Sequence, residues 1–179
     1  MARRLRGCWL VALLMITYGC GTDTGWSPRP APTPAPLVKG ECPRDGDGLI
    51  HPQVPDDQYA GGLPPADFVP TQVIRCVVDG PETRKDGRLG YTVEELVGTP
   101  SDDLSQALSL PDDGQSGWHE VCPARAEIPI RLLLVDAAGQ GYWPRIPITW
   151  CHEARSEVSR AVAAISWRER ATFQVMREP

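Results

Sequence analysis

Basic side chains are scarce in this 179-residue chain, and its N-terminal apolar run is short. Trp9–Ile16 falls well below the roughly 20 apolar residues that a transmembrane helix needs. The first 20 residues hold three arginines and no acidic residue. The remainder therefore carries 15 basic and 23 acidic side chains, a formal net charge of −8. This balance argues against binding to nucleic acid and against electrostatic binding to anionic lipid, because both kinds of binding need a basic surface.

Signatures of catalysis are also missing. The sequence has no Gly-x-Ser-x-Gly elbow for a nucleophilic serine, and it has three histidines. The pairs Asp102/Asp103 and Asp112/Asp113 are better explained by a helix start and a turn. We therefore predict that the chain is not an enzyme. A hydrolase with an unrecognised site is the third of three hypotheses on function.

Two metal-binding patterns occur in the sequence, but both are weak. We therefore predict that the chain binds no metal and no cofactor. His119-x-x-Cys122 and Cys151-His152 could converge on zinc, but in an exported chain the same proximity favours a disulfide. Asp45-x-Asp47 resembles the start of a calcium loop, yet a leucine stands at the next ligand position.

The N-terminus has the features of a bacterial export signal. Three arginines precede the apolar run Trp9–Ile16, and Gly19 stands directly before Cys20. We predict a signal peptide over residues 1–20 with Cys20 as the lipid-attachment cysteine, so that the chain lies outside the cytoplasm, anchored to the cell membrane. Plain secretion as a soluble protein is the alternative.

Four further cysteines form an even set in a chain expected to be exported, which predicts two disulfides. Four cysteines allow three connectivities. A hairpin turn near Gly139 would bring Cys151 close to Cys122. This favours the pairs Cys122–Cys151 and Cys42–Cys76.

Composition divides the rest of the chain into three parts. Residues 21–41 alternate proline with other residues, which predicts an extended tether with a reach near 60 Å at roughly 3.1 Å per residue. Residues 42–70 are rich in turn signals and are expected to form an irregular arm. Residues 71–179 are expected to form one compact domain.

Within that domain, hydrophobic periodicity predicts strands and helices in the order ββα-ββ-αβ. The fold class is α+β, an antiparallel sheet of about five strands with two helices on one face, stapled by two disulfides. The expected strands are 72–78, 88–97, 128–135, 142–150 and 172–176, and the expected helices are 101–108 and 153–165.

Part of the chain resembles a known family. Arg75-Cys76, the helix Asp103–Leu108 and Cys122-Pro123 are similar to motifs of the Streptomyces subtilisin inhibitor family, over residues 71–151. The resemblance implies a reactive loop just after the second Cys-Pro. Its residues would be Pro123, Ala124, Arg125, Ala126 and Glu127, with Ala124 or Arg125 presented to a protease. The chain is also similar to uncharacterised actinomycete secreted lipoproteins, and its preference for arginine over lysine, 16 to 2, is typical of such sources.

Aromatic side chains offer a different candidate site. Tyr142 and Trp143 open a predicted strand and could form a surface pair that binds a ligand or partner. The leading hypothesis is a membrane-anchored, non-enzymatic binding module of the cell envelope. The alternative is a serine protease inhibitor acting on an extracellular protein through residues 123–127.

Overall fold

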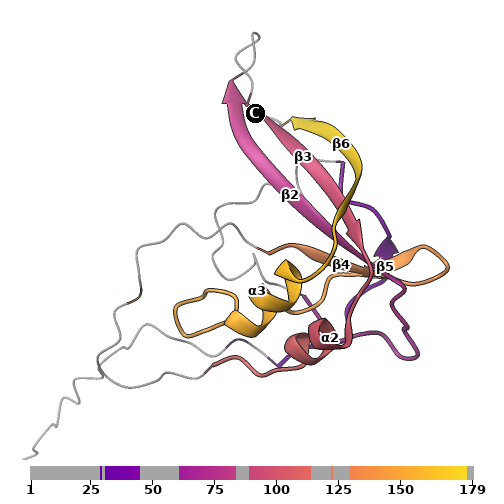
Figure 1. Ribbon diagram of the computed structural model, residues 1–179, viewed down its shortest axis with the longest axis vertical. Coiled ribbons are helices and arrows are strands. Elements are labelled where there is room, and N and C mark those ends of the chain that lie inside the picture. The colour runs from indigo at the N-terminus through magenta and orange to yellow at the C-terminus, as the bar shows by residue number, and fades with distance from the viewer. Residues whose placement is uncertain are drawn as a thin grey trace, which may run out of the picture.

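A computed structural model describes residues 29, 31–44, 61–83, 89–113, 122 and 130–176. The described chain forms a six-stranded sheet in the order β1-β5-β4-β2-β3-β6, with every neighbouring pair antiparallel (Figure 1). The strands are β1 (Val38–Lys39), β2 (Gln72–Thr83), β3 (Leu89–Gly98), β4 (Leu132–Val135), β5 (Gln140–Tyr142) and β6 (Arg168–Met176), and the helices are α2 (Asp102–Leu108) and α3 (Ser156–Ala163). The α+β class is confirmed. The expected count of five strands was wrong, because Val38–Lys39 adds a sixth strand from outside the predicted domain.

The centre of the sheet is made by β2 and β4. Val73 and Ile74 are fully buried in β2, and all four residues of β4 are buried. Adjacent strand residues point to opposite faces, so the sheet is covered on both sides here. The predicted strand 128–135 is correct as a central strand but begins at Leu132, and residues 128 and 129 lie outside the described part.

The turn between β4 and β5 lies where it was predicted, near Gly139. The Asp136 Oδ1 atom accepts hydrogen bonds from the backbone N–H groups of Ala138 and Gln140, each at 2.9 Å. Gly139 has a φ of 78°, which glycine adopts without a Cβ clash. The prediction of a returning strand over 142–150 was wrong in extent, because strand β5 runs from Gln140 to Tyr142. Pro144 and Pro147 lack the N–H donors that would extend the ladder.

Helix α2 begins where its cap predicts. The Ser101 hydroxyl accepts a hydrogen bond from Leu104 N at 3.1 Å, and Leu104 and Ala107 face the core. Helix α3 begins at Ser156, three residues later than expected. A turn precedes it, in which Thr149 N donates to the carbonyl of Glu153 at 2.7 Å.

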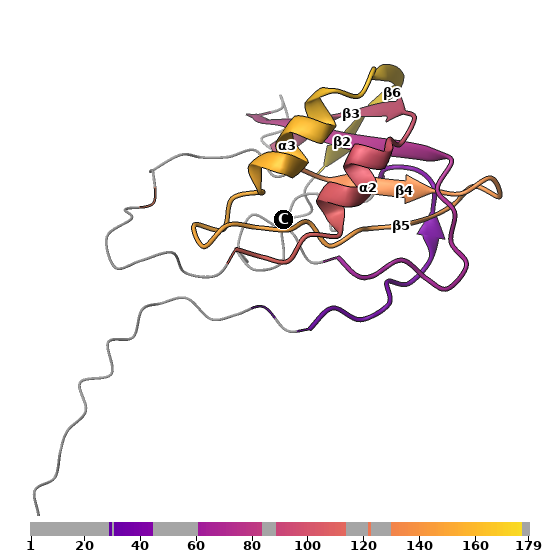
Figure 2. The same cartoon turned by 60° about the horizontal axis from the view of Figure 1, so that its bottom comes forward.

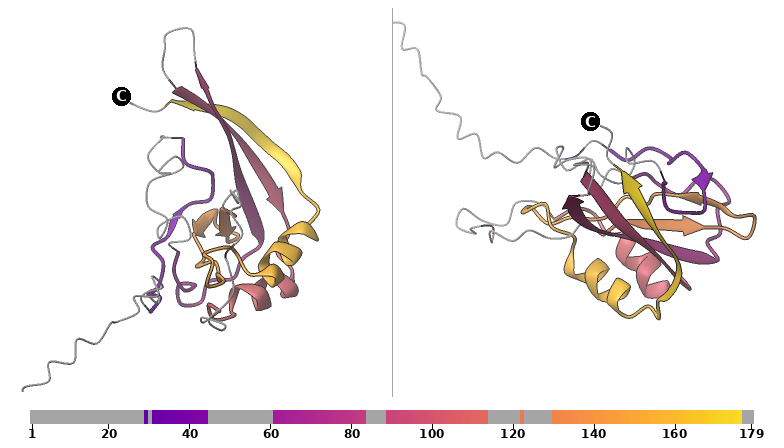
Figure 3. Two further views of the ribbon diagram at one scale, coloured as in Figure 1. Left: turned by 90° about the vertical axis from the view of Figure 1, so that its left-hand side faces the viewer. Right: turned by 90° about the horizontal axis from the view of Figure 1, so that it is seen from above.

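The two faces of the sheet are covered by different parts of the chain (Figure 3). Both helices pack on one face, as predicted, and they are seen together in front of the strands in Figure 2. Their buried partners are Val73, Leu104, Ala107, Leu132, Leu134, Tyr142, Ile146, Ile148, Ala154, Val158, Ala161, Val162 and Ile165. The N-terminal segment covers the other face, where the buried residues are Cys42, Ile74, Cys76, Val93, Val97, Leu133, Val135 and Val175.

The described residues of the proline-rich segment contact the rest of the domain. Ala35 N donates to the Leu63 carbonyl at 2.9 Å, and Leu63 N donates to the Thr33 carbonyl at 2.9 Å. Val38 and Lys39 then pair with β5. Residues 31–41 were expected to be a tether, but they form part of the folded unit.

Candidate functional site

Both predicted disulfides are present. Cys42 is joined to Cys76, and Cys122 is joined to Cys151 with 5.4 Å between their Cα atoms. Cys122 and Cys151 therefore hold no thiolate that could bind zinc. Among the described residues, no group of three or more His, Cys, Asp or Glu side chains could hold a metal ion.

The loop implied by the inhibitor resemblance is fixed at both ends. Cys122 is held by its disulfide, and Ile130 packs against the helix-side core. Residues Pro123, Ala124, Arg125, Ala126 and Glu127 themselves lie outside the described residues, as do the signal peptide and Cys20.

The aromatic pair does not form one binding surface. Tyr142 is buried in the helix-side core, whereas Trp143 is partly buried against the opposite core. The Tyr142 ring meets the Phe68 ring edge-on, with 4.8 Å between centroids. Burial raises the pKa of the Tyr142 hydroxyl.

The structure shows a pocket of about 620 Å³ where the N-terminal segment and residues 61–70 approach α2. Its volume falls within the range of small-molecule sites. It is lined by Pro32, Gly62, Leu63, Pro64, Phe68, Pro70, Ser105, Leu108, Ser109, Leu110, Pro111, Asp112, Leu134, Tyr142, Pro144, Arg145 and Pro147.

Proline dominates the chemistry of this pocket. Six of its 17 lining residues are prolines, which have no backbone N–H to offer a ligand. Leucines, Phe68 and Tyr142 supply most of the remaining wall, and Ser105 and Ser109 from the α2 side add hydroxyls. The wall therefore favours an apolar ligand over one rich in hydrogen-bond acceptors.

A charged cluster stands at one end of the pocket. Asp112 accepts hydrogen bonds from Arg29 Nε at 3.1 Å, from Arg145 Nη2 at 2.5 Å and from Ile148 N at 3.1 Å. Arg29 also donates to the Ile146 carbonyl at 2.7 Å. Burial alone would raise the pKa of Asp112, but the hydrogen bonds from both arginines outweigh it and lower that pKa to about 2.

A third arginine, Arg155, holds the same loop from the α3 side. Arg155 contacts the Asp113 carboxylate at 2.7 Å, the Glu157 carboxylate at 3.0 Å and the Pro111 carbonyl at 3.0 Å. The hydrogen bond from Arg155, followed by that from the backbone N–H of Glu157 itself, lowers the pKa of the Glu157 carboxyl to about 2. The segment Pro111–Asp113 is thus fixed beside the pocket by arginines from three parts of the chain.

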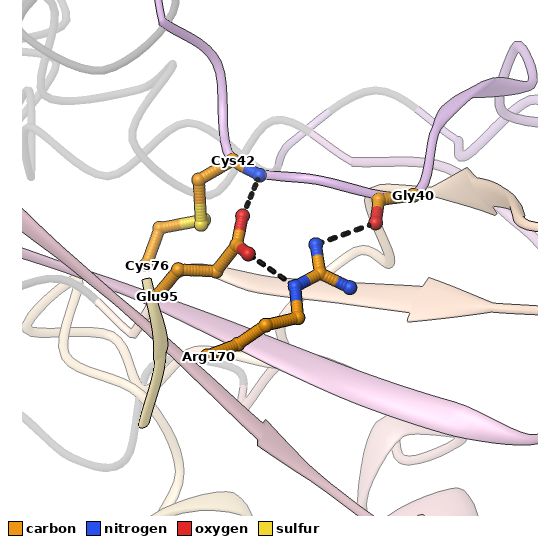
Figure 4. The surroundings of a disulfide bond; sticks show 5 residues. All are labelled: Gly40, Cys42, Cys76, Glu95 and Arg170. Carbon is orange, nitrogen blue, oxygen red and sulfur yellow. Dashed lines mark hydrogen bonds and ion pairs between the residues drawn. A yellow bond between two sulfur atoms is a disulfide. The ribbon is translucent and has the colours of Figure 1, made fainter. Parts of the chain in front are cut away.

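A separate cluster attaches the N-terminal segment to the opposite face (Figure 4). The buried Glu95 carboxylate accepts a hydrogen bond from Cys42 N at 2.6 Å and pairs with Arg170 Nε. Arg170 also donates to the Gly40 carbonyl at 2.9 Å. Beside them, the Cys42–Cys76 disulfide makes the attachment covalent.

Sequence reasoning missed the pocket because one of its sides comes from segments that the pattern assigned to a tether and an irregular arm. The available signal was the proline-rich composition of residues 29–36 and 61–70 itself. The close approach of residues 33–35 to residue 62 also requires a glycine at position 62. A Cβ on Gly62 would lie 2.5 Å from the Thr33 carbonyl oxygen.

The fold and the pocket define an α+β domain in which an apolar pocket lies beside an ion-pair cluster. Comparison with family models, with curated proteins and with solved structures finds no match to this chain. Within the described residues, no helix is long and apolar enough to cross a membrane.

Proposed function

We propose that this chain is an exported, membrane-anchored, non-enzymatic binding module, and that its ligand site is the proline-lined pocket. The observation that carries the proposal is the pocket itself, an apolar cavity of about 620 Å³ with a few polar groups at its edge. Such a cavity is the usual form of a small-molecule site. The two disulfides support export, because disulfides persist in oxidising compartments.

The test is a fluorescence titration with 1-anilinonaphthalene-8-sulfonate, a small apolar anion whose emission rises in apolar surroundings. The full chain carries Cys20→Ser so that acyl groups cannot contribute. We expect saturable binding with a stoichiometry of one. Ser105→Trp places a large ring at the pocket wall from an exposed helix position and should abolish that binding.

A matched control lies one residue further along α2. Gln106 is exposed and does not line this pocket, but borders an adjacent, more polar hollow between α2 and α3. Gln106→Trp should therefore leave dye binding unchanged. Equal binding by both tryptophan variants, or no saturable binding by the parent chain, would contradict the proposal.

The alternative is a serine protease inhibitor. The observation that favours it is the anchoring of the implied loop by the Cys122–Cys151 disulfide and by Ile130. A loop fixed at both ends loses little conformational entropy when it binds a protease in extended form. This supports presentation of Ala124 or Arg125.

Titration of the full chain against subtilisin and trypsin tests the alternative. Stoichiometric loss of protease activity, with slow cleavage at residues 124–125, is the result expected of an inhibitor. Arg125→Ala should weaken inhibition of trypsin far more than that of subtilisin. Rapid digestion at this loop without inhibition would eliminate the alternative for these two proteases.

A further inference from the structure

The described part of the chain leaves three large apolar side chains exposed, and all three lie on the segments that build the pocket. Leu37 is 47% exposed, Leu63 is 47% exposed and Val69 is 70% exposed. Leu63 lines the pocket, and Val69 stands between Phe68 and Pro70, which also line it. The apolar wall of the pocket thus continues onto the outer surface.

The pocket also lies close, along the chain, to the predicted lipid-attachment residue. Arg29 is ion-paired with Asp112 at the end of the pocket, and it follows Cys20 by nine residues. Nine residues span at most about 32 Å when fully extended. An acylated Cys20 would therefore hold the pocket within that distance of the bilayer, about half the reach expected if the whole proline-rich segment were free.

The chemistry of the wall selects among molecules found at a membrane. A peptide or sugar needs hydrogen-bond partners along its length, and six prolines leave much of this wall without donors. A hydrocarbon chain needs none and gains from each apolar surface it covers. Leu63 lines the pocket and is 47% exposed, so its side chain carries the apolar wall to the surface.

From these observations we infer that the pocket binds an acyl chain of a phospholipid from the membrane to which the protein is anchored. This inference rests on the proposed function, because it names the ligand class of the same pocket. A neutral bilayer is the appropriate probe, because residues 21–179 carry a net charge of −8 and an anionic bilayer would repel them.

The experiment uses the full Cys20→Ser chain and phosphatidylcholine vesicles that contain self-quenched, nitrobenzoxadiazole-labelled phosphatidylcholine. Removal of labelled lipid by the protein relieves the quenching. We expect a saturable rise in emission with the parent chain and with Gln106→Trp. Ser105→Trp should weaken the apparent affinity by about tenfold or more, equivalent to roughly 1.4 kcal/mol or more.

A second measurement distinguishes a membrane phospholipid from a free fatty acid as the source of the acyl chain. It also distinguishes failure of the acyl-chain inference from failure of the proposed binding function. cis-Parinaric acid, a fluorescent fatty acid, is titrated in solution. Binding of parinarate without any removal of phosphatidylcholine would overturn the membrane-lipid inference in favour of a free fatty acid. Binding of anilinonaphthalene sulfonate without either acyl ligand would overturn the acyl inference but leave the binding function standing. Failure of all three probes would overturn both.

Discussion

The two faces of the sheet are closed in different ways. On one face, α2 and α3 bury a continuous set of apolar side chains that includes Leu104, Val158 and Val162. On the other, a nearly irregular segment around Gly40–Cys42 covers the sheet and is held by a disulfide, a buried Glu95 and Arg170. A helix presents enough apolar surface to pack by itself, whereas a short irregular segment needs covalent and charged attachments. The covering of the second face should therefore depend on a few residues.

The largest effect is expected from the disulfides, which allow the two faces to be compared directly. Their loops are similar, with sequence separations of 34 and 29 residues, so chain entropy assigns each about 3–4 kcal/mol. Cys42 and Cys76 are also buried core residues, whereas Cys122 is exposed. Replacing both Cys42 and Cys76 by serine should lower the free energy of unfolding more than the same change at Cys122 and Cys151. Urea denaturation measures both, and equal losses would contradict the account.

The next effect concerns the buried carboxylate. Glu95→Ala removes the acceptor of the Cys42 N–H and the partner of Arg170. Breaking a buried ion pair costs about 3–5 kcal/mol, and partial exposure of Arg170 reduces the expected loss to about 2–3 kcal/mol. Glu95→Gln keeps a hydrogen-bond acceptor and should cost less.

The neighbouring Glu94 is the matched control, since it lies exposed on the same strand. Glu94→Ala should change the free energy of unfolding by no more than about 0.5 kcal/mol. Similar midpoints for Glu94→Ala and Glu95→Ala in urea would show that the Glu95 cluster does not hold the segment.

The smallest effect is expected at the ion-pair cluster, and it depends on pH. Asp112 has a pKa of about 2 in the folded protein, below its value near 3.9 when unfolded. Its contribution is therefore present above about pH 4 and is lost as the pH falls towards 2. Asp112→Asn should destabilise the protein by about 1–2 kcal/mol at pH 7, after allowance for partial exposure, and by almost nothing at pH 2.

Asp113→Asn is the companion variant, because Asp113 contacts Arg155 from a more exposed position. It should cost under about 1 kcal/mol at pH 7. Thermal unfolding of both variants between pH 2 and pH 7 checks the order. A loss at Asp112 that stays constant across this range would refute its assignment to the carboxylate's charge.

Local signals predicted several elements of the fold well. Ser101 begins a helix that it caps, and Asp136 and Gly139 form the expected turn. Both disulfide pairs followed from the position of that turn. The cap and the turn depend on residues near one another in sequence, which is where propensity and capping act.

The remaining features depend on contacts between distant segments. Prolines at alternate positions predicted a free tether, yet Ala35 between two of them keeps an N–H that binds the Leu63 carbonyl. The extended form that proline favours is also the form that a sheet edge accepts. Composition alone does not distinguish an extended spacer from an extended segment bound to a distant partner, so both β1 and the pocket were missed.

Backbone hydrogen exchange at Ala35 and Leu63 in the full chain tests the central claim, that the proline-rich segment is folded against residues 61–63 at the side of the ligand pocket. Both amides donate across the contact between the two segments. We expect them to exchange far more slowly than free peptide, and we expect Gly62→Ala to remove this protection, because the added Cβ would meet Thr33 and Ala35. Exchange of both amides at the rate of a free peptide in the parent chain would contradict the account.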